Sequence, residues 1–274
     1  MAIDDDFDIP ETGAVFTFGK SRFADNAPSK FWIKNDVITK VSCGDEHTSV
    51  ITETGRIFMI GSNDMGQLGL GNTNPVNKPS CVKALKPDRA VQVACGRSHT
   101  IAACESGAVY AWGHNGDGQL GTGVLGDSYH PSLVLQLDQP ALAVAAGSTH
   151  SILLTSNGEL YVWGSNDVGQ LGLDVDVQLV PMLMTLNEPI VAVEAGYYHT
   201  LALTDVTHWY VWGRNDFGQQ GLDADVQLGP VLKTLKEPVF AVVAGYYQLL
   251  LLDESSANNY CGVSGMTKFG HAGG

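Results

Sequence analysis

A glycine-rich segment that occurs four times at a nearly constant spacing constrains the fold of this chain more than any other feature. Its first copy runs from Gly61 to Gly71, and its leading glycines, Gly61, Gly113, Gly164 and Gly213, are 52, 51 and 49 residues apart. A period near 50 residues is typical of repeat proteins, in which each unit is one supersecondary element. We therefore expect one continuous array of similar units.

One complete unit contains four short apolar segments with turn residues between them. In the unit that begins at Ala90, these segments are Ala90–Ala94, His99–Cys104, Ala108–Trp112 and Pro131–Leu137. Four short strands joined by turns are the pattern of one antiparallel blade, and no stretch has the periodicity of a helix. The sequence predicts an all-β propeller of about five blades.

A second repeated motif consists of glycine, two variable residues and histidine at the start of the second strand. Its histidines are His47, His99, His150 and His199, and the fifth copy carries Gln248. Glutamine keeps the hydrogen-bonding capacity of histidine but is a poor metal ligand. We therefore interpret these histidines as structural residues that form hydrogen bonds within their own blades.

The glycines of the first motif are also interpreted as structural, because tight turns and close packing favour glycine. These positions are Gly61, Gly66, Gly69, Gly113, Gly118, Gly121, Gly164, Gly169, Gly172, Gly213, Gly218 and Gly221.

The ends of the chain depart from the repeat. Residues 1–12 are expected to be an acidic disordered lead, residues 13–262 the propeller and residues 263–274 a poorly ordered tail. Ala14–Phe18 resembles the third strands of later units, so we expect it to close the ring against the last blade. Asn259–Gly262 could be a degraded third strand. Units four and five are near-duplicates: Gly172–Thr204 and Gly221–Asp253 agree at 21 of 33 positions.

Charge and composition argue against several classes of function. The net charge is −14, and no Lys or Arg occurs between Arg97 and Arg214. Binding to nucleic acid or to an anionic membrane needs clustered cations, which most of this chain cannot supply. No apolar run approaches the ~20 residues of a membrane span. Five cysteines without a C-x-x-C motif suggest reduced thiols in a cytoplasmic or nuclear setting.

No motif for catalysis, a cofactor or a metal emerges. The glycine-rich segment lacks the Gly-Lys-Ser/Thr ending and the following helix of a phosphate-binding loop. The pairs Asp174/Asp176 and Asp223/Asp225 have too few neighbouring oxygen ligands for a calcium loop. No Gly-x-Ser-x-Gly elbow is present. We expect no catalytic residue, no cofactor and no metal site.

The variable pair inside each Gly-x-x-His turn is the candidate partner-binding surface. Loops on a rigid scaffold commonly carry binding function, and tyrosines are good anchors. All these turns should lie on one face of the ring; plain surface variation is the alternative interpretation. The residues are Asp45, Glu46, Arg97, Ser98, Ser148, Thr149, Tyr197, Tyr198, Tyr246 and Tyr247.

Three motifs in fixed order, the Gly-Gln-Leu-Gly loop, the Cys-Gly-x-x-His-Thr turn and an aromatic-glycine strand end, resemble the regulator of chromosome condensation family over residues 14–262. That resemblance implies a propeller, normally of seven blades. Gly13–Ala24, Lys30–Asp36, Ser42–His47 and Lys78–Pro87 resemble a ciliary branch of the family. The implied partners are a small GTPase, or a prenyl-binding carrier and a scaffold of the ciliary transition zone. The implied location is the cytoplasm at the cilium base or axoneme rather than the nucleus.

Three functions follow as alternatives. The first is a non-enzymatic interaction scaffold for ciliary protein transport and small-GTPase regulation. The second is a guanine-nucleotide exchange factor, which the resemblance implies would use a wedge inserted into one blade. The repeat spacings of 49 to 52 residues leave no room for such an insertion and favour the scaffold. The third is a truncated fragment without independent function.

Overall fold

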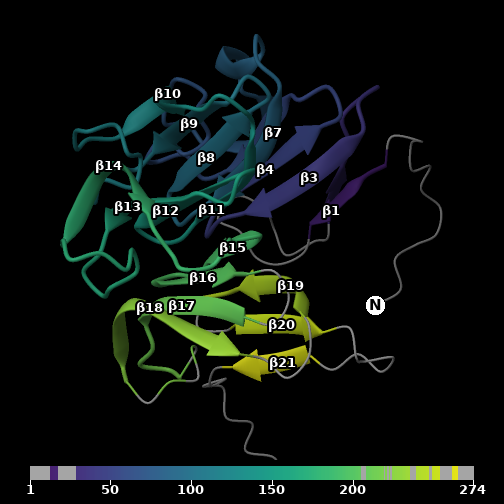
Figure 1. Ribbon diagram of the computed structural model, residues 1–274. Coiled ribbons are helices and arrows are strands. Elements are labelled where there is room, and N and C mark those ends of the chain that lie inside the picture. The colour runs from purple at the N-terminus through teal and green to yellow at the C-terminus, as the bar shows by residue number, and fades with distance from the viewer. Residues whose placement is uncertain are drawn as a thin grey trace, which may run out of the picture.

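The computed structural model describes residues 13–17, 29–204, 208–218, 220, 222, 224–234, 239–246, 249–253 and 261–264. Within them the chain is all-β apart from one short 3-10 helix, η1 (Lys83–Leu85). Antiparallel sheets follow one another around a common axis (Figure 1). This arrangement confirms the predicted propeller of about five blades.

Each of the first four blades is a four-stranded meander. Blade one contains β3 (Ile38–Cys43), β4 (His47–Thr52), β5 (Ile57–Gly61) and β6 (Val76–Cys81). Blade two contains β7 (Ala90–Cys95), β8 (His99–Cys104), β9 (Ala108–Gly113) and β10 (Ser128–Gln136). Blade three contains β11 (Ala141–Ala146), β12 (His150–Thr155), β13 (Leu160–Ser165) and β14 (Val177–Met184). Blade four contains β15 (Ala192–Ala195), β16 (His199–Leu203), β17 (His208–Arg214) and β18 (Val226–Thr234).

Blade five has three strands among the described residues, β19 (Val239–Ala244), β20 (Leu249–Asp253) and β21 (Cys261–Ser264). Its third strand ends two residues beyond the boundary at 262 that the repeat pattern indicates. Near the start of the chain, β1 (Val15–Thr17) pairs with β2 (Ser29–Phe31).

The predicted ring closure by Ala14–Phe18 is wrong for the residues that the structure describes. The strand pairs with β2, and blade five fills its own third position with β21. The motif similarity identifies Val15–Thr17 as a third strand as well. A blade contains only one third strand. The strands β1 and β21 therefore belong to two different partial blades.

The apolar core lies between successive blades. Ile51 and Met59 of blade one pack with Ala102 and Trp112 of blade two. Equivalent clusters join blades two and three, three and four, and four and five. The second strands β8 and β12 are buried along their whole length, because alternate side chains contact the blades on either side.

Polar contacts cross the same interfaces at one repeated point, the backbone carbonyl of the glutamine in the Gly-Gln loop. The indole Nε1 of Trp112 donates to Gln67 O at 2.9 Å, and the hydroxyl of Thr100 donates to the same oxygen at 2.8 Å. Blade two thus binds the loop of blade one through two donors. The next two interfaces repeat the pattern with Trp163 and Ser151 on Gln119 O, and with Trp212 and Thr200 on Gln170 O.

The repeat histidines extend this contact. His47 Nε2 lies 3.0 Å from Thr100 Oγ1, and His99 and His150 make the same contact with Ser151 and Thr200. Each hydroxyl uses its single hydrogen on the glutamine carbonyl, so the imidazole donates from Nε2. The predicted hydrogen bonds within the histidines' own blades are therefore wrong for His47, His99 and His150. The partner belongs to the next blade, because the blades stack face to face at this position.

The glycine-rich loop folds around a buried asparagine. Asn63 Oδ1 accepts from Leu68 N at 2.9 Å, while its Nδ2 donates to two loop carbonyls. Gly69 has φ +65°, and a Cβ there would lie 2.8 Å from the indole nitrogen of Trp112. Only glycine fits such a backbone so close to the ring. The other predicted structural glycines in the described residues also have positive φ, and Gly221 lies outside those residues.

We predict that the inter-blade hydroxyl contributes measurably to stability. Thr200→Val keeps the shape of the side chain but leaves His150 Nε2 without its acceptor in a buried site. The free energy of unfolding should fall by about 1–3 kcal/mol. Urea unfolding checks this, with Thr200→Ser as the matched control because Ser151 fills the equivalent position. A valine variant as stable as the serine variant would contradict the role of the hydroxyl.

We also predict that stability falls on acidification below pH 6.5. Burial lowers the histidine pKa values to about 4 for His47 and His199 and about 3 for His99 and His150. Between these values and 6.5 the unfolded chain binds more protons, so acidification favours unfolding. Each histidine contributes up to about 1.4 kcal/mol per pH unit. Glu194 offsets the effect of about one histidine. Burial raises the pKa of Glu194 to about 7, so acidification through this range favours the folded form.

The pH dependence of urea unfolding between pH 7 and pH 4 provides the measurement. His150→Gln should lower the number of protons taken up on unfolding by about one, which makes the free energy of unfolding less dependent on pH. The same substitution at the exposed His130 serves as the control. Equal pH dependence of the His150→Gln variant and the unmodified chain would refute the burial of a neutral imidazole.

Candidate interaction face

In blades one to four, two turns of each blade lie at the same end of the propeller. The second and third strands pair so that His47 is opposite Gly61, which brings the Gly-x-x-His turn next to the glycine-rich loop. Ser62 N donates to Glu46 O at 2.8 Å, and Arg214 N donates to Tyr198 O at 2.9 Å in blade four. The variable pairs and the start of the loops thus form one continuous face.

The first turns of all five blades converge at the axis. They line a hollow of about 210 Å³ that includes Asp45, Arg97, Gly147, Tyr197 and Tyr246. The structure thereby brings together the turns of the predicted surface. Backbone hydrogen bonds join adjacent turns, from Arg97 N to Gly147 O at 3.1 Å and from Ser148 N to Tyr197 O at 2.9 Å.

The predicted residues differ in accessibility. Asp45, Glu46, Arg97 and Tyr246 are exposed, whereas Ser98, Thr149, Tyr197 and Tyr198 are half-buried. Ser148 is only 1% exposed, so its side chain cannot contact a partner. The turn of blade four covers it. Tyr247 lies outside the described residues.

An aromatic cluster forms where blades two, four and five meet. The rings of Tyr197 and Tyr246 stack with centroids 3.7 Å apart, and Tyr198 meets Tyr197 edge-on at 4.8 Å. The guanidinium of Arg97 lies 5.9 Å from the centroid of Tyr197. That of Arg214 lies 5.6 Å from Tyr198. We call Arg97, Tyr197, Tyr198, Tyr246 and Arg214 the aromatic cluster.

Carboxylates surround this cluster. Partial burial raises the pKa of Asp45. The nearby positive charge of Arg97 partly offsets this rise, and the negative charge of Glu46 adds to it. A second hollow beside the first is lined by Asp45, Glu46, Asp64, Met65 and Tyr246, among others. The face therefore offers aromatic rings and two guanidinium groups within an acidic border.

The glycine-rich loops provide a second row of this face, which was not among the residues predicted from the sequence. The signal was available, because antiparallel pairing places the end of a third strand beside the start of the second. Each loop presents an aspartate, in three blades followed by an apolar residue. These residues are Asp64 and Met65, Asp117, Asp167 and Val168, and Asp216 and Phe217.

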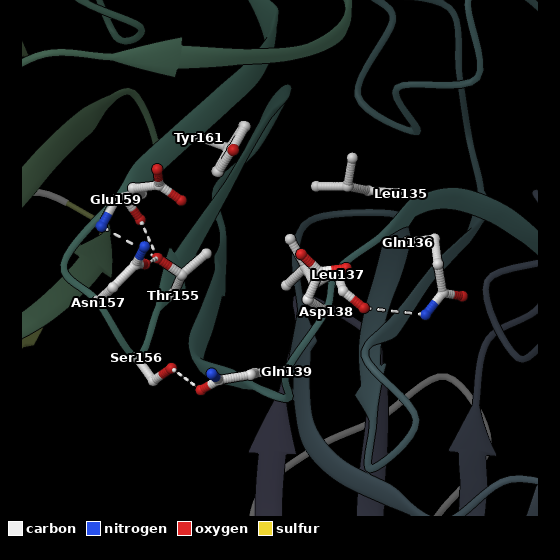
Figure 2. A pocket seen from close by; sticks show the side chains of 10 residues that line it. All are labelled: Leu135, Gln136, Leu137, Asp138, Gln139, Thr155, Ser156, Asn157, Glu159 and Tyr161. Atoms are coloured by element: carbon white, nitrogen blue, oxygen red, sulfur yellow. Dashed lines mark hydrogen bonds between the residues drawn. The ribbon is translucent and has the colours of Figure 1, made fainter.

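A separate hollow of about 320 Å³ lies at the opposite end of blade three (Figure 2). It is formed by the connection from β10 to β11 and by the β12–β13 turn. Its polar groups largely bond to one another: Ser156 Oγ donates to Gln139 Oε1 at 3.2 Å, and Thr155 Oγ1 bonds within its own turn. We therefore assign the candidate interaction site to the axial face.

Within the described part of the chain, no helix is long and apolar enough to span a bilayer. The same residues contain no group of three His, Cys, Asp or Glu side chains with the proximity of a metal site.

Comparison with protein-family models matches residues 9–273 to the RCC1-like domain. The chain belongs to the RCC1-like domain family. Among curated proteins, it is 48% identical to the X-linked retinitis pigmentosa GTPase regulator of Homo sapiens over 180 residues, 65% of this chain and 18% of that protein. The Canis lupus familiaris protein is 51% identical over 168 residues, 61% of this chain and 17% of the relative. The chain spans about a sixth of these relatives.

Solved structures agree on the fold. A crystal structure of human WBSCR16 gives a TM-score of 0.77 at 24% identity, covering 84% of this chain and 61% of that one. Yeast RCC1 (Prp20), crystallised with Kap60, gives a TM-score of 0.75 at 20% identity, and the match covers 89% of this chain and 65% of that one. At these identities the likeness concerns the fold alone.

Proposed function

We propose that this propeller is a non-enzymatic protein-interaction scaffold and that it binds its partner through the axial face. The observation that carries the proposal is the aromatic cluster, in which Arg97, Tyr197 and Tyr246 converge from three blades. Tyrosine and arginine near the centre of a surface are the residues that most often dominate binding energy. The surrounding aspartates would restrict which partner can approach, through charge complementarity.

The partner class that we propose is a small GTPase, or a prenyl-binding carrier together with a scaffold of the ciliary transition zone. Similarity to the X-linked retinitis pigmentosa GTPase regulator supports a role in GTPase regulation and ciliary protein transport. It also supports a location at the cilium base or along the axoneme.

A guanine-nucleotide exchange factor is the second candidate. Its support is the fold likeness to yeast Prp20p, whose solved structure was described together with its binding to Gsp1p and histones. Against it, the described strands of blades one to four form plain meanders without an added hairpin.

We predict that the aromatic cluster determines partner capture. The full chain would be immobilised and exposed to lysate of ciliated cells, once with nucleotide-loaded and once with nucleotide-free GTPases, and the bound proteins identified by mass spectrometry. For a partner captured by the unmodified chain, Tyr246→Ala should reduce capture about tenfold, which corresponds to about 1.4 kcal/mol. Tyr129→Ala is the matched control, because Tyr129 is 45% exposed on β10 and Tyr246 is 46% exposed.

The pattern of capture distinguishes the candidates. Recovery of carriers and ciliary scaffolds regardless of nucleotide supports the scaffold. Recovery of one GTPase chiefly in its nucleotide-free form supports the exchange factor. Equal loss of capture in the Tyr246→Ala and Tyr129→Ala variants would show that the axial face is not the binding site.

A further inference from the structure

Among the described residues, the repeated hydrogen bonds that join successive blades end at the interface between blades three and four. Thr200 pairs with Ala195 and Trp212 in the register of blade four, and both residues donate to blade three. In blade five the same register places Leu249 opposite Ala244 and Ser264 opposite Leu249. Neither the hydroxyl of threonine or serine nor the indole of tryptophan is therefore present at its repeated position.

The histidine of blade four reflects this loss. Both ring nitrogens of His199 are buried and have no hydrogen-bond partner among the described residues, whereas Nε2 is bonded in His47, His99 and His150. The residue at the repeated glutamine position of blade four, Gln219, lies outside the described residues.

Further unpartnered polar groups gather at this interface. Trp209 packs with Val242 of blade five, yet its buried Nε1 has no acceptor among the described residues. Ala192 packs against the same cluster, and Glu194, two residues along the strand, points the same way. The carboxyl group of Glu194 has no hydrogen bond or ion pair with a described residue. Buried polar groups are normally paired, so this concentration marks one interface as different from the other three.

We infer that blade five is weakly attached and that the propeller opens at the interface between blades four and five. Opening would expose Leu201, Trp209 and Val211 of blade four to water. Blades one to four would stay together, because each of their interfaces keeps the carbonyl with its two donors. Local opening along the least stable interface is how proteins usually move on slow timescales.

The opening has a consequence for the axial face. Tyr246 belongs to blade five and Tyr197 to blade four, so their stacked pair exists only while this interface is closed. A ligand that contacts both rings would stabilise the closed state by its preference for that state. The inference goes beyond the proposed function and needs no partner for its test.

Hydrogen–deuterium exchange of the full chain, followed by mass spectrometry, tests the inference. Amides of β16, β17 and β20 should exchange at least about tenfold faster than those of β8, β9, β12 and β13. Similar rates in all these strands would overturn it.

Two substitutions separate a weak interface from simple fraying at a chain end. Leu249→Thr restores a hydroxyl at the position that Thr200 occupies in blade four and should slow exchange in β16 and β17 about tenfold, with Leu250→Thr as the control. Thr200→Leu removes the hydroxyl from the interface of blades three and four and should make β12 and β13 exchange faster. Unchanged exchange of β16 and β17 in Leu249→Thr would overturn the inference, even if blade five itself exchanges rapidly.

Discussion

The backbone carbonyl of the loop glutamine is the contact on which this propeller depends. It lies at the edge of one blade and accepts hydrogen bonds from the indole and the hydroxyl of the next, as Gln67 does from Trp112 and Thr100. The apolar clusters supply most of the attraction between blades, but apolar surfaces are not directional. The paired donors fix how one blade is positioned on its neighbour, and the histidine that donates to the hydroxyl joins the turn at the axis to the same point.

This contact also explains why the repeat is rich in glycine. The loop must bring its carbonyl within 2.9 Å of the indole nitrogen, and the backbone around Gly69 then lies against the ring itself. A side chain would force the two blades apart. The glycine-rich motif resembles a phosphate-binding loop in composition, but here it lets one blade pack closely against the next. Its buried asparagine, such as Asn63, satisfies the loop backbone in the place of a ligand.

Much of the fold was accessible from the sequence, because a period near 50 residues and four apolar segments per period leave few alternatives. The identity of the partner at each repeated position was not. A period shows that His47 and His99 are equivalent, but it cannot show whether each bonds to its own blade or to the next. Ring closure failed for a related reason, since similarity to a third strand does not reveal which strand will pair with it. The burial of Ser148 depends on the neighbouring turn, which no single unit encodes.

The candidate face and the weak interface have a common origin in the near-duplicate units four and five. Because both units carry a Tyr-Tyr pair, adjacent blades present equivalent rings, and Tyr197 can stack on Tyr246. The fifth unit nevertheless differs from the fourth at the positions that hold blades together, where Leu249 replaces the threonine and Gln248 the histidine. The aromatic pair is therefore built across the one described interface without the repeated hydrogen bonds. A surface assembled in this way depends on the docking of a blade as well as on the residues that it displays.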